Sequence, residues 1–112
     1  MNKILFPKKT LFLLFFCSSA FAKPETGNMS EVDSLYVPTE ASARVYVDFK
    51  FSSAMPGCYK NKGGYLYGDN TNNAYAALLS ALKSGSKIRP FYQINEGNEG
   101  WSKCYIKAVS VY

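Results

Sequence analysis

Residues 71–92 read TNNAYAALLSALKSGSKIRPFY, and this stretch decides the fold class. Thr71 or Asn72 can cap the start of a helix, because their side-chain oxygens accept the free amide protons of a first turn. Gly85 is placed to end the helix, because glycine readily adopts the left-handed conformation beyond a helix end. The stretch therefore predicts a helix over residues 72–84, with a strand directly after it.

The predicted helix carries two apolar rows. One face collects large side chains at helical spacing: Tyr75, Leu78, Leu79 and Leu82. A second row, made of small side chains, lies beside it: Ala74, Ala77 and Ala81. The face with the large side chains is expected to pack on a sheet. The alanine row is either additional core or a surface that a neighbouring subunit approaches closely.

Strand patterns precede the helix. Residues 43–51 read ARVYVDFKF, in which Val45, Val47, Phe49 and Phe51 alternate with more polar positions. This alternation predicts a half-buried strand. A turn at residues 56–57 then leads into a second strand, which begins at residues 58–59 and resumes at residues 65–67 after an interruption.

Two further strands are expected after the helix. In the first, residues 87–92, Pro90 indicates an edge strand or a bulge because proline cannot donate to a ladder. A polar loop over residues 93–100 joins it to the last strand, residues 101–112. That last strand has apolar side chains on both faces, so it is expected to be buried on both sides.

The first 22 residues have the three parts of a secretory signal peptide. A basic head with three lysines precedes an apolar run from Leu11 to Phe16, and small residues lead up to Ala22. Cleavage is predicted after Ala22, which makes the protein secreted or periplasmic, and the compact lysine-rich head is of a bacterial style. The apolar run falls short of the roughly 20 apolar residues that a membrane helix needs, as does every later stretch, so no membrane span is expected.

The remaining chain is expected to be one α+β domain over residues 43–112, preceded by a flexible arm or edge strand over residues 23–42. Once the three signal lysines are removed, positive and negative charges nearly balance. Nucleic-acid binders displace counterions with a dense basic stripe, and this sequence has none. No nucleic-acid partner is therefore expected.

Cys17 is removed with the predicted signal peptide, so two cysteines remain in the mature chain. Cys58 and Cys104 are predicted to form a structural disulfide, because disulfides persist outside the cytoplasm and small domains gain from them. The sequence contains no histidine, and two cysteines make half of a zinc site. Neither a metal nor another cofactor is expected.

Catalysis has few candidate residues. Without histidine, serine and cysteine triads lose their usual base. A paired-carboxylate hydrolase would draw on Asp48, Asp69, Glu96 and Glu99, but one of these acids would need an apolar pocket that raises its pKa. Glu96 and Glu99 stand in a polar, glycine-rich loop. The sequence predicts a protein that is not an enzyme.

Aromatic residues make up 16% of the chain. Tyrosine and tryptophan offer a flat apolar face and a polar edge, which suits both sugar stacking and protein interfaces, although tyrosine also fills half-buried strand positions. Trp101 is the favoured binding residue because it stands where a polar loop meets a strand. Tyr65 and Tyr67 share a strand face and extend the predicted site, and Asn95 and Glu99 are expected to supply hydrogen bonds.

The order of these elements resembles the small B subunits of subtilase-cytotoxin and pertussis-like toxins. The resemblance rests on Cys58 before the helix, the helix AYAALLSAL at 74–82, its exit SGSKIR at 84–89, and Cys104 after it, and it covers about residues 43–112. It implies a small, mostly antiparallel barrel of about five strands, of the oligosaccharide-binding (OB) type with one helix. It also implies a ring-shaped pentamer that binds surface glycans. The region that carries that family's sugar contacts is short here, so no binding residue is transferred.

Two non-enzymatic functions follow from these patterns. The first is a secreted carbohydrate or host-receptor binding module of the toxin-B-subunit kind, assembled as a homo-oligomer through the helix. The alternative is a periplasmic interaction or inhibitor protein, which would hold its partner through the tyrosine-rich faces or the helix alanines.

Overall fold

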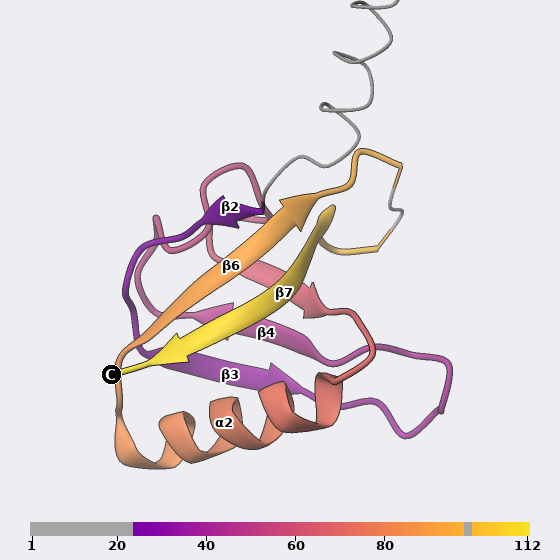
Figure 1. Cartoon of the computed structure of the whole chain (residues 1–112). Coiled ribbons are helices and arrows are strands. Elements are labelled where there is room, and N and C mark those ends of the chain that lie inside the picture. The colour runs from indigo at the N-terminus through magenta and orange to yellow at the C-terminus, as the bar shows by residue number, and fades with distance from the viewer. Residues whose placement is uncertain (1–23, 98–99) are drawn as a thin grey trace, which may run out of the picture.

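The computed structural model describes residues 24–97 and 100–112, so the predicted signal peptide and Glu99 lie outside the described residues. The described residues form one helix and one sheet (Figure 1). In chain order the elements are β2 (Glu25–Thr26), β3 (Val32–Tyr36), β4 (Tyr46–Phe49), β5 (Gly63–Leu66), α2 (Thr71–Ser84), β6 (Ile88–Ile94) and β7 (Cys104–Val111). The predicted α+β class with a single helix is confirmed for this part of the chain.

The sheet has six strands in the order β2-β6-β7-β5-β4-β3. Every neighbouring pair is antiparallel except β5 and β7, which are parallel. The edge strands β2 and β3 do not pair with each other, so the described sheet is mixed and is not closed into a barrel. The expectation of a mostly antiparallel sheet is confirmed, and six strands are present where about five were expected, but the expectation of a closed barrel is wrong.

Both edges of the sheet come from one N-terminal segment. β2 pairs with β6, Ser30 bridges Ile88 at the start of β6, and β3 then pairs with β4. β2 and β3 therefore lie at opposite edges of the described sheet, and no ladder joins them. Residues 23–42, expected to be a flexible arm or a single edge strand, thus contribute two edge strands, and Val32 among them is buried in the core.

Helix α2 ends where the sequence predicts, and Gly85 follows it in the left-handed conformation with a φ of 74°. Its N-cap is Asn70 rather than Thr71 or Asn72, and the Asn70 side chain makes no capping hydrogen bond. The buried face is centred between the two predicted rows. Leu78 and Ala81 are buried and Ala74 and Tyr75 pack on the core, whereas Leu82 is exposed. The alanine row therefore belongs largely to the core.

Two predicted strand faces differ from the structure. Tyr46 of β4 holds one of the more polar positions of the expected alternation but is buried, because the loop that carries Trp101 covers it. Phe51, expected on the apolar face, lies beyond the end of β4 and is exposed. In β7, Cys104 and Ile106 are buried and later residues are exposed or half-buried. The strand was expected to be buried on both sides, but its pairing with β5 is limited to residues 105–106.

The predicted disulfide is present. It joins Cys58, in the loop before β5, to Cys104, the first residue of β7, and both residues belong to the core. Pro90 also sits in a strand with an irregular register, between Phe91 and Tyr92, as its sequence position suggested. However, β6 lies inside the sheet between β2 and β7 rather than at its edge.

The disulfide is expected to supply a large share of the stability. It spans a sequence separation of 46 residues, and closing a loop of that length restricts the unfolded chain by about 4 kcal/mol. The double variant Cys58→Ser/Cys104→Ser should lose about that much free energy of unfolding in urea titrations, and reduced wild type should match it. A double variant within about 1 kcal/mol of the oxidised protein would contradict this account.

Candidate functional site

Four tyrosines stand in register across four neighbouring strands. Tyr36 of β3 pairs with Tyr46 of β4, Tyr46 pairs with Tyr65 of β5, and Tyr65 pairs with Tyr105 of β7. Cross-strand partners point to the same face of a sheet, so these side chains form a single row, here called the tyrosine row. The rings of Tyr46 and Tyr65 meet edge to face, with their centroids 5.1 Å apart.

Trp101 lies over the tyrosine row and comes from the loop between β6 and β7. Its ring makes edge contacts with Tyr36 and Tyr46, at 5.1 Å between centroids in each case, yet 57% of the residue is exposed. Its backbone N–H donates to the Tyr65 hydroxyl at 2.8 Å. A Cβ on Gly100 would collide with the Tyr65 ring, so glycine at this position lets the loop approach the sheet closely.

The residue after Trp101 fixes the loop from the other side. The Ser102 hydroxyl donates to the Gly63 carbonyl at 2.8 Å and accepts the Cys104 N–H at 3.2 Å. Ser102 is buried, and Cys104 carries the disulfide. Trp101 is therefore an exposed ring on an anchored loop, which is the arrangement that binding surfaces commonly use.

Two cations lie over a second pair of rings. Tyr67, directly after β5, stacks on Tyr105 with 4.5 Å between centroids. The Arg44 guanidinium lies 4.6 Å from the centroid of Tyr67 and 5.3 Å from that of Tyr105. Lys107 places its Nζ 4.7 Å from the Tyr67 ring. Such contacts attract cations to the ring faces and leave the N–H groups available to a ligand.

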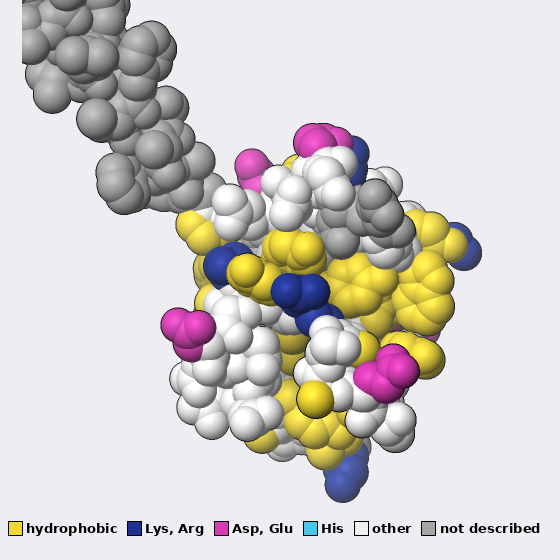
Figure 2. Space-filling view, turned by 90° about the vertical axis from the view of Figure 1, so that its right-hand side faces the viewer, with side chains coloured by type: hydrophobic (Ala, Val, Ile, Leu, Met, Phe, Trp, Pro, Cys, Tyr) yellow, Lys and Arg dark blue, Asp and Glu magenta, His cyan; other side chains and the backbone are white. Residues whose placement is uncertain are grey.

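A hollow of about 330 Å³ opens beside Trp101, and it is called the aromatic hollow here. Its walls come from the tyrosine row, from the loop between β3 and β4, and from the Trp101 loop. They include Tyr36, Glu40, Arg44, Tyr65, Trp101 and Tyr105. Figure 2, which views the side of the molecule where these loops lie, shows hydrophobic side chains gathered around Lys and Arg side chains.

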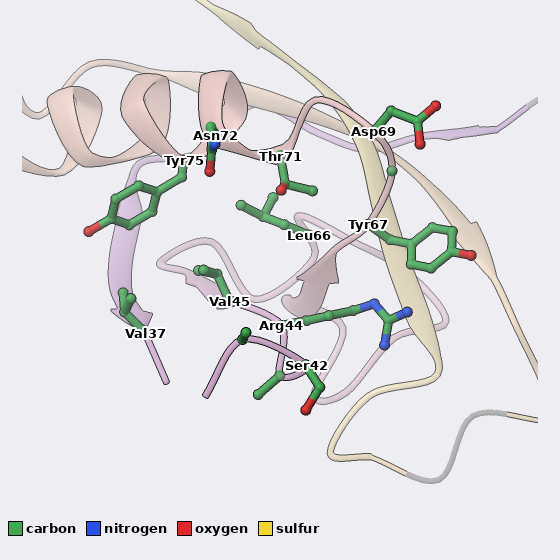
Figure 3. Close-up of a pocket in the computed structure, with 13 residues that line it drawn as sticks. Val37, Ser42, Arg44, Val45, Leu66, Tyr67, Asp69, Thr71, Asn72 and Tyr75 are labelled. Atoms are coloured by element: carbon green, nitrogen blue, oxygen red, sulfur yellow. The ribbon is translucent and has the colours of Figure 1, made fainter. Parts of the chain in front are cut away.

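A second hollow, of about 600 Å³, lies between the β3–β4 loop and the start of α2 (Figure 3), and it is called the helix hollow here. Val37, Val45, Leu66 and Tyr75 form its apolar walls, and polar side chains such as Ser42, Thr71 and Asn72 lie around them. Ser42, Ala43 and Arg44 line both hollows. The two hollows are thus neighbours that share one wall.

The residues predicted from the sequence are distributed unevenly over this site. Trp101 and Tyr65 lie together in the aromatic hollow, and Tyr67 lines the helix hollow. Asn95 lines neither hollow, because its side-chain oxygen accepts the N–H of Gly97 within its own loop at 3.2 Å. Glu99 lies outside the described residues.

Sequence reasoning missed Tyr36 and Arg44. Tyr36 belongs to the apolar triplet at residues 35–37, which is the signal of a short strand in an otherwise polar segment. Arg44 and Tyr46 alternate with the apolar residues of the strand over residues 43–51, so the pattern places both on the face opposite the apolar one. The sequence signal for this part of the site is the arginine at position 44 followed, two residues later on the same face, by the tyrosine at position 46.

Two of the carboxylates considered for catalysis lie in separate surroundings. Glu96 pairs with Lys103 at 3.1 Å in the loop after β6, whereas Asp69 is an exposed residue of the helix hollow. Burial, with a further contribution from Asp48, raises the pKa of Tyr46 above its ordinary value, so this hydroxyl stays neutral. Within residues 24–97 and 100–112, no three His, Cys, Asp or Glu residues lie close enough to hold a metal ion.

No helix in the described part of the chain has the length and apolar character needed to cross a bilayer. A scan against models of protein families finds no match for this chain, and a search of curated proteins finds no relative.

Tyr65 is expected to fix the position of Trp101. Tyr65→Phe removes the acceptor of the Trp101 N–H, a loss of about 0.5–1.5 kcal/mol of unfolding free energy. Trp101 is the single tryptophan of the chain, so its fluorescence should become easier to quench with acrylamide. Tyr46→Phe is the matched control, because the buried Tyr46 hydroxyl has no hydrogen-bond partner among the described residues. Equal quenching in both variants and wild type would refute the positioning role.

Proposed function

We propose that this protein is a secreted, non-enzymatic carbohydrate-binding module whose site is the aromatic hollow. The observation that supports this most is the position of Trp101, an exposed indole anchored over a row of tyrosines. Its ring and that of Tyr36, which is 56% exposed, both border the hollow.

The chemistry of the hollow matches that of a sugar ring. A pyranose has C–H faces that stack on an aromatic ring, and hydroxyls around its edge that need hydrogen-bond partners. Trp101 and Tyr36 offer the apolar surface. The Tyr65 hydroxyl, the Glu40 carboxylate and the Arg44 guanidinium line the same hollow and offer acceptors and donors. Because Trp101 is already held by its loop, binding costs little conformational entropy there.

The strand order supports the OB-type relation proposed for the fold, although the sheet is unclosed. If β2 and β3 are counted as one bent strand, this strand pairs with β4 at one end and with β6 at the other. The helix then lies in the chain between the third strand, β5, and the fourth strand, β6. OB-type proteins bind oligosaccharides or oligonucleotides on the face of their second and third strands, between two neighbouring loops. Here those strands are β4 and β5. The aromatic hollow is lined by the loop over residues 37–45 and by Trp101 of the loop before β7.

A protein partner is the second candidate, and the free edge of the sheet favours it. β3 has no strand on its outer side in the described structure. Tyr36 at its end and Val37 beside it are 56% and 48% exposed, close to Trp101. Such an edge can add a strand from a partner, and Trp, Tyr and Arg are the side chains that contribute most at interfaces. A periplasmic interaction or inhibitor protein would use this edge.

The carbohydrate proposal predicts that Trp101→Ala loses binding on a glycan array while its melting temperature stays within a few degrees of wild type. Loss of a stacking residue at the centre of a site costs about 2 kcal/mol or more, which corresponds to a fall in affinity of at least about thirtyfold. Tyr112→Ala is the control, because Tyr112 is 62% exposed and lines neither hollow. If wild type binds no glycan on the array, the carbohydrate proposal fails and a partner protein becomes the working hypothesis.

The toxin-B-subunit part of the proposal predicts a ring. The purified protein should have about five times the mass of one chain in light scattering, since the related rings are pentamers and multivalency raises weak glycan affinity. A monomeric mass would remove the ring. It would leave the aromatic hollow as the site of a solitary binding module.

A further inference from the structure

We infer that the ligand is an acidic oligosaccharide that spans both hollows, with a carboxylate or sulfate on an internal sugar unit bound to Arg44. This inference rests on the proposed carbohydrate binding and adds the class of glycan.

Arg44 stands between the two hollows. Its guanidinium lies over Tyr67, which lines the helix hollow, and over Tyr105, which lines the aromatic hollow. Arg44 is also one of the residues that line both hollows. In Figure 3 its side chain extends from the β3–β4 loop toward Tyr67 at the margin of the helix hollow. A positive charge therefore stands where the two hollows meet, and a ligand that runs from one to the other passes it.

Among the described residues, no ion pair neutralises the charge of Arg44. The ion pairs of the described residues are Lys50 with Glu31 and Lys103 with Glu96, so no described carboxylate pairs with Arg44. The guanidinium lies over the Tyr67 and Tyr105 rings, and no described carboxylate accepts a hydrogen bond from its N–H groups. A planar fork of donors matches a carboxylate or sulfate group with two parallel hydrogen bonds.

The charges along the two hollows alternate in sign. Glu40 lines the aromatic hollow and Asp69 lines the helix hollow, and both are exposed carboxylates. They repel anions at these positions and accept hydrogen bonds from sugar hydroxyls. Lys107 of β7 also lies over the Tyr67 ring, so it adds a second positive charge near Arg44. This pattern favours neutral sugar units on either side of one anionic group.

The size of the site supports more than one sugar unit. Each hollow, at about 330 and about 600 Å³, falls within the range of roughly 300–1,000 Å³ that is typical of complete small-molecule sites. A monosaccharide in the aromatic hollow would leave the apolar walls of the helix hollow, such as Val45 and Leu66, without contact. A chain of several units would cover Trp101, pass Arg44 and reach Tyr75.

The test uses matched glycans on the purified full-length protein. Hexasaccharides of hyaluronan and chondroitin, in which uronate and neutral units alternate, are compared with their carboxyl-reduced neutral forms and with the corresponding disaccharides, by array and then by calorimetry. Carboxyl-reduced chondroitin sulfate, which keeps its sulfates, is compared with carboxyl-reduced chondroitin, which is neutral. We expect at least one acidic hexasaccharide to bind about tenfold to a hundredfold tighter than its neutral form, and its disaccharide to bind at least tenfold more weakly. Hyaluronan and chondroitin carry only carboxylates, and carboxyl-reduced chondroitin sulfate carries only sulfates, so the comparison shows which anionic group is bound.

Two variants locate the effect. Arg44→Gln should bind the acidic and the neutral hexasaccharide equally, because the charged hydrogen bonds are lost. Lys83→Gln removes the same charge from the last turn of α2, away from both hollows, and should keep the acidic preference. Melting curves of both variants should match wild type.

The outcomes separate this inference from the proposed function. Equal binding of acidic and neutral forms, binding to neutral array glycans alone, or equal affinity for disaccharides and hexasaccharides would overturn the acidic spanning ligand while Trp101-dependent binding stands. An acidic preference that survives in Arg44→Gln would overturn the assignment to Arg44. Absence of binding to every glycan would overturn the proposed function and this inference with it.

Discussion

The parallel pairing of β5 with β7 is the constraint on which the rest of this structure depends. It joins β3, β4 and β5 to the later strands, through the pairs Tyr65–Tyr105 and Leu66–Ile106. Parallel neighbours need a long crossover, which α2 and β6 supply here. A ladder this short is weak alone. The Cys58–Cys104 disulfide and the hydrogen bond from Ser102 to Gly63 close the chain beside it, so covalent and polar contacts reinforce the junction where the sheet has the fewest pairs.

The same junction builds the candidate site. The tyrosine row crosses it, because Tyr65 and Tyr105 are register partners, and the Trp101 loop leads directly into the first residue of β7. A shift of one residue in this pairing would send every side chain of the shifted strand to the opposite face. The row would then be broken and Trp101 would lose the Tyr65 hydroxyl. Stability and binding geometry therefore depend on many of the same contacts at this junction.

The parts of the fold that were predictable from the sequence are those with local causes. The C-terminal end of α2 follows from Gly85, and the disulfide follows from the two cysteines that remain after the signal. The register of the tyrosine row follows from long-range pairing, which no local pattern contains. Alternation showed that Tyr46 and Val47 face opposite ways, but the cover over Tyr46 comes from Trp101, 55 positions later by its number in the sequence. Asn95 was misplaced because a side chain in a loop can bond its own backbone, as Asn95 does with Gly97.

Trp101 and Arg44, on two walls of the site, are held with different rigidity. This difference determines which property of a ligand each residue can select. Trp101 is held by Tyr65, Ser102 and the nearby disulfide, so the aromatic wall keeps its shape and discriminates by the fit of a ring. Arg44 lies on an exposed loop with a turn of its own, in which the Ala43 N–H donates to the Glu40 carbonyl at 3.1 Å. Stacking over two rings restrains its long side chain without fixing it in one place. A charge carried in this way can follow an anionic group over a range of positions, so the site selects shape at Trp101 and charge at Arg44.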